Sequence, residues 1–168
     1  ENLAVARTRG SDMWTVRLKD LQGIRWRASA STPSAPMSPG AITPEDFLDL
    51  EPSEATDVFH LGALTYALLA GQPAFGQPGD SLEALKAALT GETPVPARRL
   101  FTLRDDLSED ADMFLTKCLQ RHPSARPRSV GYFIRGIHHL VMCFAESHPH
   151  EDIPPELWHR LSRGLTLG

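Results

Sequence analysis

Residues 56–75 read TDVFHLGALTYALLAGQPAF, the longest nearly uncharged run in the chain, with Asp57 as its only formal charge. Apolar residues recur in it at spacings of three and four, at Val58, Leu61, Leu64 and Leu68. This period predicts a helix, and the apolar residues that fill its other faces predict a helix buried at the centre of a fold. The rest of the chain is expected to pack around it.

Both ends of this helix are marked in the sequence. Ser53 and Thr56 are alternative N-caps, because a short hydroxyl side chain accepts a hydrogen bond from the first free amides of a helix. Gly71, with Pro73 just beyond it, predicts the stop. Asp57 lies at the N-terminal end of an otherwise apolar helix, so it is either a cap of that helix or an anchor for another segment.

The bulk composition predicts one ordinary globular domain of 168 residues, 41% hydrophobic and 23% charged. A formal net charge of −4 gives no case for a nucleic-acid-binding surface. The sequence shows neither a signal peptide nor a membrane-spanning stretch. Cys118 and Cys143 are expected to be buried, reduced thiols of a cytoplasmic protein. Because residue 1 is Glu rather than Met, we expect a piece of a longer protein.

The remaining elements are predicted from turn and cap signals. Residues 2–7 and 13–18 are β-prone runs around a Gly/Ser/Asp turn, which predicts a hairpin. Residues 28–39, rich in Ser, Pro and Ala, predict a loop. Further helices are predicted over residues 43–50, 81–91, 108–122, 129–147 and 154–165. The fold class is therefore mainly α, with one short β-hairpin and about six helices around a buried central helix.

Several segments together resemble the carboxy-terminal, helical lobe of the protein kinase superfamily. The central helix is similar to the kinase F helix in DVFHLG at residues 57–62 and LLAGQPAF at residues 68–75. Residues 37–45, MSPGAITPE, are similar to the family's Gly-Thr-Pro-x-Tyr-Met-Ala-Pro-Glu segment, and residues 122–127, HPSARP, to its Asp-Pro-x-x-Arg-Pro signature. Residues 1–5 and 16–22 are similar to the catalytic-loop end and to the strand that carries Asp-Phe-Gly.

The resemblance implies a domain division and structural roles. The kinase-like lobe would span residues 1–150, with a catalytic-loop tail and metal-strand hairpin (1–23), an activation-loop-like segment (24–45) and a helical subdomain (46–150), and residues 151–168 would add an extra helix. Glu45 would pair with Arg126 in a partly buried bidentate contact. Asp57 would be a buried anion that holds the catalytic-loop backbone. Ser38 would occupy the threonine position of the substrate-side segment.

At the amino end the resemblance implies ligands for ATP and magnesium in a parent protein. Asn2 and Asp20 would bind the metal through oxygen atoms, and Ala4 would lie under the nucleotide base. The triplet at Asp20 reads Asp-Leu-Gln, however, so Gln22 replaces a glycine that lets the backbone turn. The Gly-rich loop, strand lysine, helix glutamate and catalytic aspartate cannot be assigned. We therefore expect no catalytic residue in this chain and no cofactor on the isolated chain.

Three functional hypotheses follow. The favoured one is a pseudokinase lobe that acts as a regulatory or interaction module. The alternative is a fragment of an active ATP- and magnesium-dependent serine/threonine kinase, which the retained Asn2 and Asp20 favour. The third is an all-helical adaptor without kinase ancestry, a hypothesis that predicts no particular role for Glu45 and Arg126. The expected partner is another protein or the amino-terminal lobe of the same protein, with no nucleic acid and no membrane.

Three further patterns leave alternatives open. Thr32 in the hydroxyl-rich loop is a possible phosphosite, or the loop is simply solvated. A group of histidines and a cysteine near the end of the predicted helix 129–147 is either a zinc site, or part of a core helix with interface histidines followed by a polar loop. These residues are His138, His139, Cys143, His148 and His150. The apolar stripe of the closing helix either packs back on the lobe or binds a partner such as a second copy, through Leu157, Trp158, Leu161 and Leu165.

Overall fold

The computed structural model describes the backbone of residues 3–7 and 14–18, and residues 42–76, 80–91, 98–104 and 106–147 with their side chains, residue 145 excepted. The chain divides into two compact units, residues 1–38 and 39–168. The boundary between the units falls inside the segment predicted to resemble an activation loop. Each unit is described by itself below.

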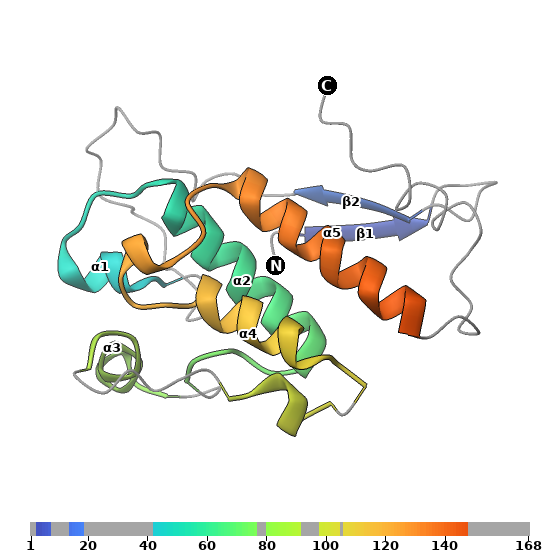
Figure 1. Ribbon diagram of the computed structural model, residues 1–168. Helices are drawn as coiled ribbons and strands as arrows, with labels where there is room; N and C mark the ends of the chain where they lie inside the picture. The colour runs from blue at the N-terminus through green and yellow to red at the C-terminus, as the bar shows by residue number, and fades with distance from the viewer. Residues whose placement is uncertain are drawn as a thin grey trace. The chain divides into compact units, whose positions relative to one another are not determined.

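The first unit contains a two-stranded antiparallel sheet (Figure 1). Strand β1, Leu3–Arg7, pairs with β2, Trp14–Leu18, and Val5 lies opposite Val16 at the centre of the ladder. Both strands fall on the two runs for which the sequence predicts a hairpin. The residues between them lie outside the described part of the chain.

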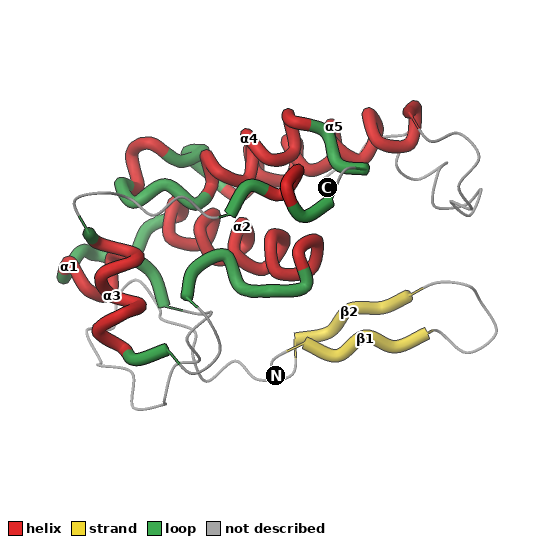
Figure 2. Tube along the Cα trace, turned by 90° about the horizontal axis from the view of Figure 1, so that it is seen from below, coloured by secondary structure: helices red, strands yellow, loops and turns green. Residues whose placement is uncertain are grey.

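The second unit is mainly helical, as the sequence predicts. Helices α2, α4 and α5 pack against one another, and α1 packs against α3 at one end of the group (Figures 1 and 2). The described residues contain five α-helices rather than about six, and the sixth prediction, residues 154–165, lies outside them. The helices are α1 Pro44–Leu48, α2 Glu54–Ala70, α3 Leu82–Thr90, α4 Glu109–Cys118 and α5 Val130–Ser147, with short 3-10 turns at Leu100–Thr102 and Pro123–Ala125.

Local hydrogen bonds explain where the central helix begins and ends. Ser53, not Thr56, is the N-cap of α2, and the Ser53 amide donates a hydrogen bond to the Thr56 hydroxyl at 3.0 Å. At the other end Gly71 adopts φ 68°, a left-handed conformation that favours glycine, and its amide donates to the Ala67 carbonyl. The predicted stop at Gly71 is confirmed.

Two glycines allow close approach of the three packed helices. A Cβ atom added at Gly62 of α2 would lie 2.8 Å from the Cβ atom of Cys118 on α4. A Cβ atom added at Gly136 of α5 would overlap the Phe114 ring of α4. The buried core around these crossings includes Val58, Phe59, Tyr66, Leu100, Leu115 and Phe133.

The prediction that α2 is buried on nearly every face is wrong for its second half. Leu64 is 40% exposed and Leu68 is 74% exposed. Both lie on the side of the helix turned away from Gly62 and Tyr66, which face the core, because residues four apart share a face. No helix in the described ranges is both long and apolar enough to cross a membrane.

The predicted end of α4 is also too late. The sequence predicts this helix up to residue 122, but α4 ends at Cys118. The carbonyl groups of Gln120 and Arg121 instead accept hydrogen bonds from the Arg126 side chain. Gln120 and Arg121 thus lie past the end of the helix, in contact with Arg126, and the periodicity of residues 108–122 does not show this contact.

Candidate functional site

A buried ion pair between Glu45 of α1 and Arg126 joins residues that are 81 positions apart. The Arg126 Nη1 atom donates to Glu45 Oε1 at 2.6 Å, and Nη2 donates to Oε2 at 2.9 Å. The Glu45 side chain is only 2% exposed, and the Arg126 side chain is 0% exposed. The contact is therefore bidentate, the geometry that gives an arginine–carboxylate pair both strength and orientation.

The rest of the Arg126 guanidinium is satisfied by the backbone. Its Nε atom donates to the Gln120 carbonyl at 2.6 Å, Nη1 to the Ala55 carbonyl at 2.9 Å and Nη2 to the Arg121 carbonyl at 3.0 Å. Together with the two bonds to Glu45, these use all five N–H groups that a guanidinium carries. The group also lies over the Phe59 ring, 4.7 Å from its centroid. Arg126 thus ties α1, the start of α2 and the segment after α4 together.

Thr56 is a further member of this site, although the sequence indicates it only as a possible cap of α2. Its hydroxyl donates to Glu45 Oε1 at 2.9 Å and accepts from the Ser53 amide. Burial alone would raise the pKa of the Glu45 carboxyl, but the hydrogen bonds and positive charge of Arg126 lower that pKa below its ordinary value. The pair is therefore held in its ionised form.

The start of α1 orients Glu45 toward the core. The hydroxyl and the amide of Thr43 each donate to Asp46 Oδ2 at 2.8 Å, which fixes the first turn of the helix. Thr43 is the N-cap of α1 and is only 1% exposed.

Asp112 of α4 is a second buried acid. Its Oδ1 atom accepts from the Leu100 amide, and its Oδ2 atom lies 3.2 Å from Arg99 Nε without the alignment of a hydrogen bond. Nearby, the Tyr66 hydroxyl donates to the Arg98 carbonyl at 2.6 Å. Burial, together with the charge of Asp112, raises the pKa of Tyr66. These contacts hold residues 98–100 against α2 and α4.

Asp57 is exposed on α2. It lies on the same side of the helix as Leu64, whereas Val58 and Phe59 enter the core. The catalytic-loop segment that Asp57 would hold, residues 1–5, belongs to the other unit. Its role as an anchor of that backbone stays a prediction.

The other predicted site residues fall outside the part of the chain whose side chains are described. Ala4 lies in β1, opposite Arg17, and only its backbone is described. Asn2, Asp20, Thr32 and Ser38 lie outside the described residues. Their metal, phosphoacceptor and substrate-side roles stay predictions.

The histidine and cysteine residues of α5 show one close pair. The Cys143 Sγ atom lies 3.7 Å from His139 Nε2 and 3.9 Å from Nδ1. Within the described residues, no group of three or more His, Cys, Asp or Glu side chains is placed to hold a metal ion. His148 and His150 lie outside these residues. The other cysteine, Cys118, is fully buried, and burial raises its pKa to about 12, so it is an inert thiol.

Comparison with known proteins found similarity to serine/threonine kinases. The chain is 33% identical over 93 residues to human calcium/calmodulin-dependent protein kinase type 1B, across 53% of this chain and 24% of that protein. It is 31% identical over 117 residues to the serine/threonine-protein kinase PkaA of Streptomyces coelicolor, across 70% of this chain and 19% of that protein. It is 31% identical over 93 residues to a fission yeast (Schizosaccharomyces pombe) calcium/calmodulin-dependent protein kinase type I.

No family model matches the chain. The chain spans about a quarter or less of the length of these relatives. The similarities support a relationship to serine/threonine protein kinases over about half of the chain.

Proposed function

We propose that this chain is the helical, carboxy-terminal lobe of a serine/threonine protein-kinase-like domain. The Glu45–Arg126 pair carries the proposal, because it joins the MSPGAITPE and HPSARP segments at the positions for which the resemblance implies a contact. An adaptor without kinase ancestry gives no reason for these two positions to meet.

Within that domain, the chain acts as a pseudokinase lobe, a regulatory or interaction module rather than a catalyst. The replacement of Phe-Gly by Leu21 and Gln22 in the metal-binding triplet supports this role. Its partner is another protein or an amino-terminal lobe of the same protein, and its location is cytoplasmic.

The second candidate is the corresponding lobe of an active kinase. Asn2 and Asp20 favour it, because amide and carboxylate oxygens are the donors that magnesium prefers. In that case these two residues would hold the ion, which would supply charge stabilisation to the phosphates of ATP. Ala4 would contact the nucleotide base.

The two candidates are separated by nucleotide binding and phosphate transfer in the parent protein. For a pseudokinase we expect no magnesium-dependent rise in melting temperature with ATP and no transfer of phosphate. Tight magnesium-dependent ATP binding, with phosphate transfer that is lost in Asp20→Ala but kept in a control such as Asp49→Ala, would establish the active kinase instead. Asp49 suits the control because it is an exposed acid at the end of α1.

A further inference from the structure

We infer that the helical unit binds a second copy of itself, with the acidic start of α2 on each copy facing the basic start of α5 on the other. The two surfaces are the acidic patch, formed by Leu50, Glu51 and Glu54, and the basic patch, formed by Arg128, Tyr132 and Arg135. The inference rests on charge and exposure within the helical unit and does not depend on the kinase-like function.

Charges of opposite sign are separated along the sequence. Residues 28–85 include eight acidic residues and neither Lys nor Arg, whereas residues 113–145 include five Lys or Arg residues and no acid. The buried Glu45–Arg126 pair neutralises one member of each group, which leaves seven acidic and four basic residues. Surfaces of opposite charge on two copies attract each other and orient the copies as they meet.

The charged side chains of both patches are open to a partner. Glu51, Glu54, Arg128 and Arg135 are all exposed. None of them forms an ion pair with another residue whose side chain the structure describes. Two negative charges on one patch and two positive charges on the other are therefore left for contacts between copies.

Each patch also contains a large exposed side chain that an interface would cover. Leu50 is 46% exposed and Tyr132 is 57% exposed. The Arg135 guanidinium lies over the Tyr132 ring, 4.4 Å from its centroid, which holds the two side chains together. Tyrosine and arginine are among the residue types that contribute most to binding energy in protein interfaces. The basic patch is thus partly ordered before a partner arrives, which lowers the entropic cost of binding.

The two patches lie at the same end of the helical unit. Arg126, two residues before Arg128, donates through Nη1 to the carbonyl of Ala55, the residue after Glu54, at 2.9 Å. The starts of α2 and α5 accordingly lie side by side (Figure 1). An interface that uses the same surface of both copies is two-fold symmetric and closes at a dimer. In such a dimer, the acidic patch of each copy meets the basic patch of the other, which gives two equivalent contacts.

The first test is analytical ultracentrifugation of the full chain over a range of protein concentrations. We expect the average mass to rise from monomer to dimer with concentration at about 0.05 M salt, and the dissociation constant to be at least about tenfold higher at about 0.5 M, because salt screens exposed charges. A chain that stays monomeric at low salt, or a dimer whose affinity does not respond to salt, would overturn the proposal.

Charge reversal tests whether these two patches form the dimer. Glu51→Lys with Glu54→Lys makes both patches positive, and Arg128→Glu with Arg135→Glu makes both patches negative. Each double variant alone should have a dissociation constant at least about 100-fold above that of the wild type, because like charges would face each other. A mixture of the two double variants should form a heterodimer, since each positive patch then meets a negative one.

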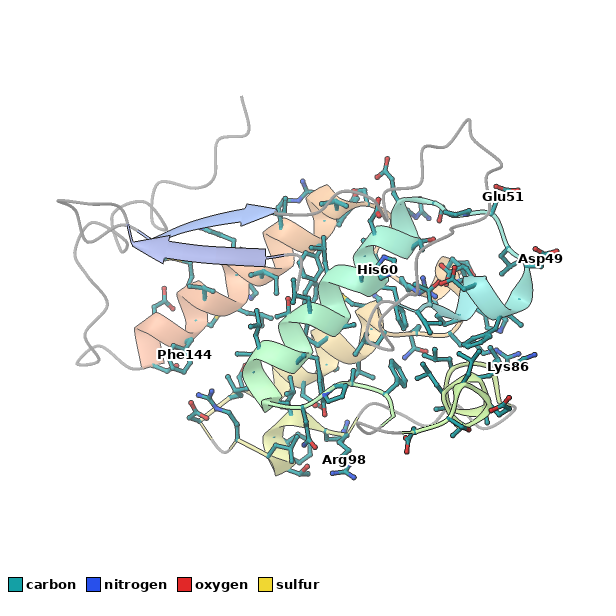
Figure 3. The ribbon with its side chains drawn as sticks, turned by 180° about the vertical axis from the view of Figure 1, so that it is seen from behind. Asp49, Glu51, His60, Lys86, Arg98 and Phe144 are labelled. Carbon is teal, nitrogen blue, oxygen red and sulfur yellow. The ribbon has the colours of Figure 1, made fainter. Side chains whose placement is uncertain are left out.

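The matched control is Arg98→Glu, which reverses an exposed charge at a different edge of the helical unit from Glu51 (Figure 3). It should dimerise with the affinity of the wild type. Circular dichroism of each variant checks that the helices still form. Homodimers of either double variant, a mixture of folded double variants that stays monomeric, or an equal loss of affinity in the control would each contradict the proposed interface.

Discussion

Replacing Glu45 by glutamine tests the buried ion pair with the smallest change in shape. The substitution removes the charge and turns one acceptor oxygen into an NH₂ group that faces Arg126 Nη2, a donor against a donor. Arg126 keeps its three backbone carbonyl acceptors but loses its counter-charge. Removing one partner of a buried pair costs about 3–5 kcal/mol, because the other charge is left uncompensated.

The measurements are thermal melting and urea denaturation, both monitored by circular dichroism. A chain of this length loses about 2–4 °C of melting temperature per kcal/mol, so Glu45→Gln should melt about 6–20 °C below the wild type. Glu51→Gln is the matched control, because Glu51 is exposed near the same end of α2. It should stay within about 0.5 kcal/mol of the wild type. A Glu45→Gln variant as stable as this control would refute the reasoning.

The pH dependence gives an independent check of the same pair. Because the pKa of Glu45 is lower in the folded state than its ordinary value of 4.5, its ionisation stabilises the fold fully above that value. That stabilisation is lost as pH falls through the folded-state pKa. The difference in unfolding free energy between wild type and Glu45→Gln should therefore be constant from about pH 6 to 8 and shrink below about pH 4.5. A difference that stays constant at acidic pH would contradict the assignment.

Two further predictions concern packing and a buried carboxylate. Gly62→Ala should lower the free energy of unfolding by about 1–3 kcal/mol, because the new Cβ atom would lie 2.8 Å from the Cβ atom of Cys118. The control is Gly131→Ala, whose Cβ atom would have no contact closer than 3.6 Å, so it should be neutral or stabilising. Thermal melts measure both. Equal effects of the two substitutions would argue against close approach of α2 and α4. Asp112→Ala should cost about 1–3 kcal/mol, because the buried Leu100 amide loses its acceptor, and Asp112→Asn should cost less in urea denaturation because it keeps an oxygen. An equal loss of unfolding free energy in Asp112→Asn and Asp112→Ala would contradict this role of the hydrogen bond.

Helix boundaries could be predicted from the sequence where a neighbouring residue determines them. The hydroxyls of Ser81 and Ser108 each accept a hydrogen bond at 3.2 Å from the amide three residues later. Their positions just before an amphipathic run predict this capping role. Gly71 ends α2 for an equally local reason, its left-handed backbone. Such signals involve residues within one turn of each other, so the sequence displays them directly.

Burial could not be predicted in the same way, because it depends on segments far apart in the chain. Leu68 and Tyr66 belong to the same apolar run, yet Leu68 is 74% exposed and Tyr66 only 2%. Asp112 belongs to the first turn of α4 together with Glu109 and Asp110, yet it is a buried acceptor, because Leu100 of the preceding 3-10 turn lies against α4. The Glu45–Arg126 contact was reached only through the family resemblance, which carries long-range information that periodicity lacks.

The contacts of Arg126 explain why this pair is expected in a lobe without catalysis. Buried ion pairs can often be replaced by apolar side chains at little cost. Here an apolar residue would leave the carbonyl groups of Ala55, Gln120 and Arg121 without their donor. For the same reason, exchanging the two residues as Glu45→Arg with Arg126→Glu should not restore stability, because a carboxylate would face three carbonyl oxygens. The backbone around α2 thus requires an arginine whether or not phosphate is transferred, and catalytic competence must be tested at Asp20.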